Sequence, residues 1–172
     1  MTDGVTFRDL EIGDAGWLVE RHAALYARDD GFDATFEALV AEVLAAYIRS
    51  RDPAMERAFI AVAGGRRVGS IFCVLSDEPA VAKLRLFLVV PEWRGRGLGQ
   101  RLLEACLGFA RQAGYRRLRL WTHESHRAAC ALYARNGFRL ATSRPVRSFG
   151  QDLVEQSWEI DLAGLAIAGG SG

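Results

Sequence analysis

The stretch that most constrains the fold of this chain is residues 83–114, where the pattern changes from strand to loop to helix. The run from Leu84 to Val90 is mostly apolar, and Pro91 has no N–H for a sheet ladder, so we expect a buried strand that stops there. Beyond the loop, apolar residues recur every three or four positions, as in a helix packed on a sheet: Leu102, Leu103, Cys106, Leu107 and Ala110. Gly114 predicts the end of that helix.

The loop between this strand and helix predicts a binding site for phosphate. It reads Arg94-Gly95-Arg96-Gly97-Leu98-Gly99-Gln100. Its glycines let the backbone come close to a ligand, and the first N–H groups of the helix stay unpaired. The helix dipole adds roughly half a positive charge at this end. Because Arg94, Arg96 and Arg101 add full charges, the expected ligand carries phosphate.

Two common phosphate loops do not fit this sequence. A P-loop needs Gly-Lys followed by Ser or Thr at the helix start, whereas Gly99 is followed by Gln100 and Arg101. A Rossmann loop needs the spacing Gly-x-Gly-x-x-Gly and an acidic residue about twenty positions later. Here single residues separate the glycines, and residues 116–122 contain no acid.

A third type of loop matches better. The pattern Arg94-x-x-Gly97-x-Gly99 resembles the acetyl-CoA pyrophosphate loop of the GNAT superfamily of acetyltransferases. Downstream, Ala129-x-x-Leu132-Tyr133-x-x-x-Gly137-Phe138 resembles the next helix of that family and its exit into a strand, in the family's order and at its usual separation. The resemblance implies an α/β (α+β) GNAT fold, in which helices flank a central, twisted, mixed and mostly antiparallel sheet.

A narrower resemblance covers residues 16–162. It is to the acetyltransferase half of bacterial fusions between a MarR-type regulator and a GNAT domain. It is carried by the region from Arg21-His22 to Tyr26 and by Ser148-Phe149-Gly150-x-Asp152-Leu153-Val154. The regulator half does not occur in this sequence, so the resemblance does not imply DNA binding.

The resemblance also implies which residues hold the cosubstrate, acetyl-CoA. The N–H groups of Gly95, Arg96, Gly97, Leu98, Gly99 and Gln100 would surround the pyrophosphate, with Arg94 beside them as a further cofactor-binding residue. The backbone edge of Leu88, Val89 and Val90 would pair with the pantetheine amides and polarise the thioester carbonyl, once the central strands splay apart. His126 stands where the family commonly has an asparagine that contacts CoA.

Tyr133 is the candidate general acid. At helical spacing it shares a face with His126, Ala129 and Cys130. By residue type alone, a core tyrosine near a helix end is the commoner interpretation. In the resembled family, however, this tyrosine lies near the CoA sulfur, so we expect it to protonate the departing thiolate.

The general base cannot be read directly. Many family members have a glutamate on the strand that corresponds to residues 83–90, which here carries Lys83 and Arg85. Glu124 and His123 rank first, because they follow the strand whose end faces the cofactor in this fold. Glu92 and a chain of water molecules stay open as alternatives.

The acceptor pocket has two candidate residues on the first helix. His22 and Tyr26 lie four positions apart and therefore face the same side. The two helices that precede the hairpin usually line the acceptor side of this fold. A core or surface placement of His22 and Tyr26 is an equally good interpretation of the sequence.

Composition narrows the function further. The net charge of +1 gives no broad basic field, so we expect no nucleic-acid partner. Cys73, Cys106 and Cys130 lie in apolar patterns without metal-ligand spacing, which predicts reduced, buried thiols and no metal. Residues 1–4 begin no signal pattern, and no apolar run approaches the roughly 18 residues of a membrane span. We expect a cytoplasmic protein without a membrane partner.

The remaining pattern predicts one domain over residues 1–172, with residues 163–172 as a flexible tail. The family often dimerises through its last strands, so the chain is expected to be a monomer or homodimer. Further strands are expected at 5–10, 59–63, 68–75, 117–121, 138–142 and 153–162, and a connection at 144–150. Further helices are expected at 14–27, at 35–49 with Asp33 or Thr35 as its cap, and near 126–133.

Three functions remain open from the sequence. The first is an acetyl-CoA-dependent N-acetyltransferase that acts on an amine of a small molecule or a protein. The second is a catalytically silent acyl-CoA-binding sensor or assembly module, favoured by the missing strand glutamate. The third, an S-adenosylmethionine methyltransferase, is weaker, because no acidic residue directly precedes the glycines of residues 95–99.

Overall fold

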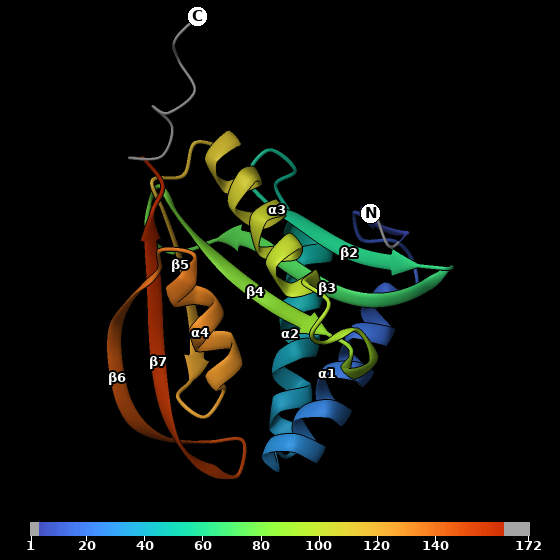
Figure 1. The fold of residues 1–172 in the computed structure, drawn as a ribbon, viewed down its shortest axis with the longest axis vertical. Coiled ribbons are helices and arrows are strands. Elements are labelled where there is room, and N and C mark those ends of the chain that lie inside the picture. The colour runs from blue at the N-terminus through green and yellow to red at the C-terminus, as the bar shows by residue number, and fades with distance from the viewer. Residues whose placement is uncertain (1–3, 164–172) are drawn as a thin grey trace, which may run out of the picture.

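The computed structural model describes residues 4–163, which form one seven-stranded sheet and four α-helices (Figure 1). The strand order is β1-β2-β3-β4-β5-β7-β6, and among the described strands only β4 and β5 run parallel. The expected mixed, mostly antiparallel sheet is therefore confirmed. The elements are β1 (Val5–Arg8), α1 (Asp14–Asp30), α2 (Ala34–Ser50), β2 (Arg57–Ala63), β3 (Arg66–Leu75), β4 (Val81–Val89), a 3-10 turn (Pro91–Trp93), α3 (Leu98–Gln112), β5 (Arg117–His123), α4 (Arg127–Arg135), β6 (Arg139–Ser148) and β7 (Gln151–Asp161).

Local sequence signals set the ends of the first two helices. The side chain of Asp33 caps α2 by accepting a hydrogen bond of 3.0 Å from the Thr35 N–H, as predicted. α1 continues through Asp30, beyond its predicted end near Ala27, because the residue that closes it is Gly31, with φ 71°.

The sheet separates two apolar cores. α3 covers one face, and α1 and α2 lie behind the other (Figure 1). The core on the α3 face includes Ile71, Leu84, Leu102, Leu103 and Cys106. The core on the α1 and α2 face includes Leu18, Val40, Leu44, Ile60 and Phe72. The central strands β3 and β4 are thus covered on both faces, as the apolar run of β4 predicted.

β4 and β5 pair only at their first residues and then diverge. Their ladder runs from Val81 opposite Arg117 to Lys83 opposite Arg119, which leaves one edge of β4 open beyond this point. A β-bulge follows, in which Leu86, with φ 48°, and Phe87 together oppose one residue of β3. The Ser70 hydroxyl stabilises the bulge by donating a 2.6 Å hydrogen bond to the Leu86 carbonyl. The splaying that the family resemblance implied is present, whereas the bulge has no signal in the sequence.

Two expectations about local structure are wrong. Residues 144–148 belong to strand β6, and the turn is confined to Phe149 and Gly150. Pro145 is tolerated because β6 is the edge of the sheet, where a missing N–H breaks no inner ladder. Cys130 is partly exposed at the surface of α4, although Cys73 and Cys106 are buried as predicted.

Two further findings concern the predicted C-terminal tail and the question of membrane-spanning helices. Apart from Ala163, the predicted flexible tail at 163–172 lies outside the described residues. Within residues 4–163, no helix is both long enough and apolar enough to cross a membrane.

A buried ion network fastens α1 to the sheet. Asp14 is fully buried and accepts hydrogen bonds from Arg8 at 2.7 Å, from Arg67 at 2.6 Å and from the Glu11 N–H at 2.7 Å. Burial acts to raise the pKa of Asp14, but the bonds from Arg8, Glu11 and Arg67 outweigh it and lower the pKa to about 2.

Replacing Asp14 with asparagine should therefore lower the free energy of unfolding by about 3 kcal/mol near neutral pH, because two partly buried arginines lose their counterion. The folded pKa lies below the ordinary value, so the stabilisation is present above about pH 4 and is lost as pH falls towards about 2. Urea unfolding at several pH values measures this. The gap between wild type and Asp14→Asn should close in acid, and a gap independent of pH would contradict the assignment.

Candidate functional site

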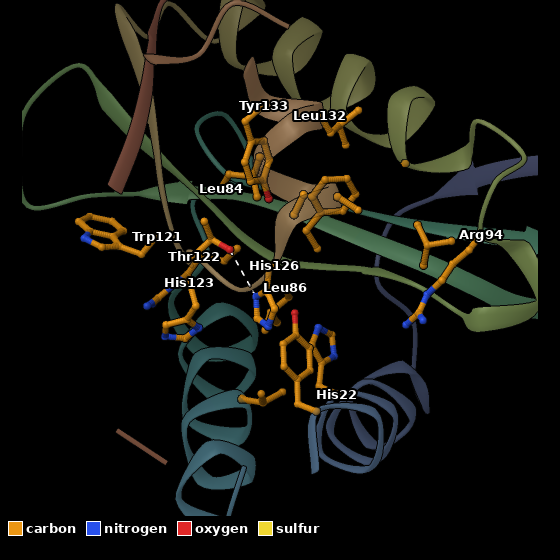
Figure 2. Close-up of a pocket in the computed structure, with 18 of the residues that line it drawn as sticks. His22, Leu84, Leu86, Arg94, Trp121, Thr122, His123, His126, Leu132 and Tyr133 are labelled. Atoms are coloured by element: carbon orange, nitrogen blue, oxygen red, sulfur yellow. Dashed lines mark hydrogen bonds between the residues drawn. The ribbon is translucent and has the colours of Figure 1, made fainter. Parts of the chain in front are cut away.

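A cavity of about 870 Å³ opens where β4 and β5 diverge. Its walls come from the glycine-rich loop, β4, the end of β5, α4, and the facing sides of α1 and α2. Figure 2 shows side chains from these separate elements directed into one space. The divergence of two central strands therefore produces a cavity that reaches from the loop to α1 and α2.

The loop has the conformation expected of a phosphate site. Gly97 is the N-cap of α3 with φ 79°, a left-handed conformation that glycine adopts without strain, and the first N–H groups of α3 follow it. Arg94 lines the cavity and lies 3.7 Å from Asp29. The guanidinium of Arg96 packs 4.7 Å from the Trp93 ring centroid. Both arginines are exposed, so they can turn towards an anion at the loop.

Arg101 does not take the role that the sequence suggested. Its guanidinium lies 5.3 Å from the Phe7 ring and donates to the Val5 carbonyl at 3.4 Å. It therefore packs on β1, away from the loop. Gln100 does reach the cavity, and its side chain exchanges hydrogen bonds of 2.8 Å with Asn136, which joins α3 to α4.

The open edge of β4 presents fewer groups than predicted. The Val90 N–H donates to the Val68 carbonyl at 3.0 Å and so faces β3. Because alternate residues of a strand direct their polar groups to opposite edges, Leu88 also faces β3, while Phe87 and Val89 face the open edge. Both of these line the cavity. Of the three predicted residues, only Val89 has its backbone at the open edge.

Tyr133 lies at the centre of the cavity wall. Its side chain is 4% exposed and packs against Phe138 and Phe87, with ring centroids at 5.5 Å and 6.3 Å. Figure 2 shows the hydroxyl directed into the cavity, and it has no hydrogen-bond partner among residues 4–163. Burial, with a smaller effect of Tyr26, raises the pKa of Tyr133. The group is therefore protonated at neutral pH and free to donate.

His126 stands at the N-cap position of α4, without a capping bond from its side chain, and connects this helix to α1. Its Nε2 lies 3.0 Å from Asp30, its Nδ1 lies 3.5 Å from the Thr122 hydroxyl, and its ring meets Tyr26 edge-on at 5.4 Å. The side chain lines the cavity, and its contact with CoA stays a prediction. The hydrogen bond to Asp30 occupies Nε2, so Nδ1 is the ring nitrogen that the Asp30 bond does not use.

His22 presents an unpartnered nitrogen in the part of the cavity wall that comes from α1. The side chain is 2% exposed, and Nδ1 donates to the Leu18 carbonyl at 2.8 Å. Nε2 is buried and has no partner in the described residues. Burial lowers the pKa of His22 to about 4, against the opposing effect of the bond to Leu18, so the ring is neutral and Nε2 is an acceptor. Tyr26 stacks on it at 6.4 Å, and burial raises the Tyr26 pKa to about 12.

The structure separates the two first-ranked base candidates. His123 lines the cavity, and its ring meets Phe32 at 5.6 Å. Burial, with a smaller effect of His126, lowers the His123 pKa, which favours the neutral ring. Glu124 is exposed and does not line the cavity, and the same holds for Glu92. Only His123 of these three is placed to meet an acceptor.

Several lining residues were missed by the sequence analysis. Phe32, Phe36 and Phe149 form an aromatic wall, in which Phe149 lies 4.9 Å from Phe32 and 5.1 Å from Phe36. The turn between β6 and β7 brings Phe149 there, and its carbonyl accepts the Asp33 N–H at 3.0 Å. No local pattern could reveal this contact, because it joins parts of the chain over a hundred residues apart.

No metal site is evident in the described part of the chain, where no group of three or more His, Cys, Asp or Glu side chains could hold an ion. The cavity itself brings together a glycine-rich loop at a helix start, an open strand edge, a protonated tyrosine and neutral imidazoles.

Comparisons with known proteins identify a family with this architecture. The model of the acetyltransferase (GNAT) family matches residues 19–138. An acetyltransferase of the GNAT family from Staphylococcus aureus has a TM-score of 0.75 at 17% identity, covering 92% of this chain and 99% of that one. The ribosomal-protein-S18-alanine N-acetyltransferase of Escherichia coli has a TM-score of 0.71 at 20% identity, covering 98% and 99%. At these identities the two structures show the shared fold.

Curated relatives match over a shorter stretch. An uncharacterised N-acetyltransferase of Methanocaldococcus jannaschii is 29% identical over 85 residues, which are 46% of this chain and 38% of the relative. The mycothiol acetyltransferase of Acidothermus cellulolyticus is 46% identical over 63 residues, 37% of this chain and 18% of the relative. The matches thus span well under half the length of either relative.

Proposed function

Because the chain belongs to the acetyltransferase (GNAT) family, we propose that it transfers an acetyl group from acetyl-CoA directly to an amine of a small molecule or protein. The observation that carries this proposal is the single cavity of about 870 Å³ that joins the glycine loop, the open edge of β4, Tyr133 and the acceptor-side helices. Direct transfer needs both substrates in one space, because the amine must reach the thioester carbon.

The chain's own groups account for binding of the donor. The N–H groups of residues 95–100 and the start of α3 bind the pyrophosphate, and Arg94 and Arg96 add charge. The open edge at Phe87 and Val89 pairs with the pantetheine amides. An N–H from this bulged edge also stabilises the oxyanion that forms on the thioester carbonyl, which in acyl transfer contributes roughly 3 kcal/mol per donor.

Transfer then proceeds by attack of a neutral amine. The amine nitrogen forms a bond to the thioester carbon, and the C–S bond breaks as the intermediate collapses. The Tyr133 hydroxyl supplies the proton to the departing thiolate, and His123 takes up the proton that the amine releases. His22 Nε2 accepts a hydrogen bond from the bound acceptor, and Tyr26 supports the His22 ring. His126 contacts the donor beside Tyr133.

One feature of β4 favours the alternative function, a catalytically silent acyl-CoA-binding module. Lys83 and Arg85 occupy the strand where many family members carry a glutamate base. Purified protein with acetyl-CoA, EDTA and a panel of primary amines should release CoA thiol well above the uncatalysed rate for at least one amine. A protein that binds CoA tightly but releases no thiol with any amine would support the silent module. Activity lost in EDTA and restored by zinc would contradict the metal-free mechanism.

We further propose a narrower relationship for this chain and a cellular context. The segments that resemble MarR fusion acetyltransferases contain His22, Tyr26 and Phe149, and all three line the cavity. We therefore propose that this chain and those acetyltransferases also share the kind of acceptor that they bind. We also propose a cytoplasmic monomer or homodimer without nucleic-acid or membrane partners. Free thiols at Cys73 and Cys106 suit a reducing compartment.

A further inference from the structure

Arg85 lies on the acceptor face of the sheet. On β4, Leu84 is opposite Cys73, which belongs to the core under α3, and Arg85 is opposite Phe72, which belongs to the core under α1 and α2. Since successive side chains of a strand point to opposite faces, Arg85 points towards α1 and α2. It lines the cavity there, away from the loop that opens α3. Its charge is therefore not available to the CoA pyrophosphate.

This guanidinium has no counterion in the structure. Within residues 4–163, neither Arg85 nor its neighbour Lys83 forms an ion pair with a carboxylate, although Lys83 packs 5.8 Å from the Trp121 ring. Burial lowers the Arg85 pKa, yet an arginine stays charged at neutral pH. A half-buried, unpaired cation is unfavourable, so a ligand that supplies an anion would stabilise it.

The other charges at this end of the cavity do not neutralise it. Glu155 lines the cavity, but its carboxylate is paired with Arg144 at 3.1 Å. The family's usual strand glutamate would make this end negative and suit a cationic amine. Here the same strand makes it positive, so the acceptor that fits should carry negative charge near its amine.

We infer that the acceptor is an amine that also carries a carboxylate, and that Arg85 binds this carboxylate beside an apolar side chain held by Phe32, Phe36 and Phe149. The inference rests on the proposed function. An arginine fork matches a carboxylate with two parallel hydrogen bonds. Arg85 precedes Phe87, at the open edge, by two residues across the bulge, and both line the same cavity, so one small molecule can meet the guanidinium and the open edge together. The substrate class is therefore apolar or aromatic α-amino acids.

Matched pairs of amines test this inference. The pairs are L-phenylalanine, L-leucine, L-methionine and L-tryptophan, each with its carboxamide, which keeps the amine and side chain but lacks the charge. Release of CoA thiol should give a kcat/KM at least roughly tenfold higher for the better acids than for their amides. Arg85→Met should erase this preference by lowering kcat/KM for the acids alone. Arg49→Met, at an exposed position of α2, is the matched control and should change neither.

Each outcome bears on one claim. If wild type prefers the amides, or if Arg85→Met lowers the rate equally for acid and amide, the inference is overturned while the proposed function stands. If no amine releases CoA, the proposed function fails, and calorimetric titration of L-phenylalanine and its amide into the CoA-loaded protein decides the inference. Tighter binding of the acid that disappears in Arg85→Met supports it, and equal binding overturns it. Unchanged CoA affinity in Arg85→Met verifies that the variant is folded.

Discussion

Replacing Tyr133 with phenylalanine should lower kcat by roughly 10²-fold or more while CoA affinity changes little. A thiol, whose pKa is near 8.5 in a cysteine side chain, leaves as a thiolate, so a protonated donor beside the CoA sulfur accelerates collapse of the intermediate. The Tyr133 hydroxyl meets this need, because burial raises its pKa and no described residue accepts its proton. Phenylalanine keeps the ring that packs on Phe138 and removes only the donor.

Tyr115 provides the matched control for this experiment. It is equally buried, but its hydroxyl donates to the Met55 carbonyl at 2.6 Å. Tyr115→Phe should therefore lower the free energy of unfolding by about 1 kcal/mol and leave kcat unchanged. Tyr133→Phe should lower kcat and leave the free energy of unfolding nearly unchanged. Steady-state and single-turnover rates from about pH 6 to about pH 9, with thermal unfolding of both variants, measure the contrast. Full kcat in Tyr133→Phe under single-turnover conditions would refute the acid role and make Tyr133 a core residue.

The sequence predicts well those features that depend on neighbouring residues. The cap at Asp33, the left-handed Gly97 and the apolar stripe of α3 are local, so their physics is contained in a few adjacent positions. The glycine-rich loop was found in this way, whereas Tyr133 was singled out only by the resemblance to a family motif, and the structure brings both to one cavity. Short-range rules thus identified the loop, while the role of Tyr133 needed the family pattern.

Features that depend on register or on distant contacts were not predictable. The bulge at Leu86 changes which residues of β4 face the open edge, and it arises from pairing with β3 and not from a turn signature. The sequence alone also could not show which charged residues line the cavity. The structure shows that Arg85 does and that Glu124 does not. The aromatic wall of the cavity joins Phe32 and Phe36 to Phe149, which lies over a hundred residues later in the chain, and this explains why the wall was missed.

Replacing Gly99 with valine should weaken CoA binding at least roughly 30-fold, about 2 kcal/mol, in a folded protein. A Cβ at this position would lie 3.7 Å from Leu132, 3.8 Å from Phe87 and 3.9 Å from Val89, so it enters the gap between β4 and α4. Ordinary contact at Cβ means that the fold accepts the residue. The two methyl groups beyond Cβ then occupy the space in which the donor would run along the open edge.

Gly108→Val separates this steric effect from any effect on the helix. Gly108 lies on the same helix, exposed, and a Cβ there meets no atom within 4 Å. Glycine and valine differ little in helix propensity, so both variants should keep the wild-type melting temperature within a few degrees. Calorimetric titration with CoA should then give wild-type affinity for Gly108→Val and a large loss for Gly99→Val. Unchanged affinity in a folded Gly99→Val protein would exclude the gap beside Gly99 as the donor site, and with it the assignment of the loop to CoA.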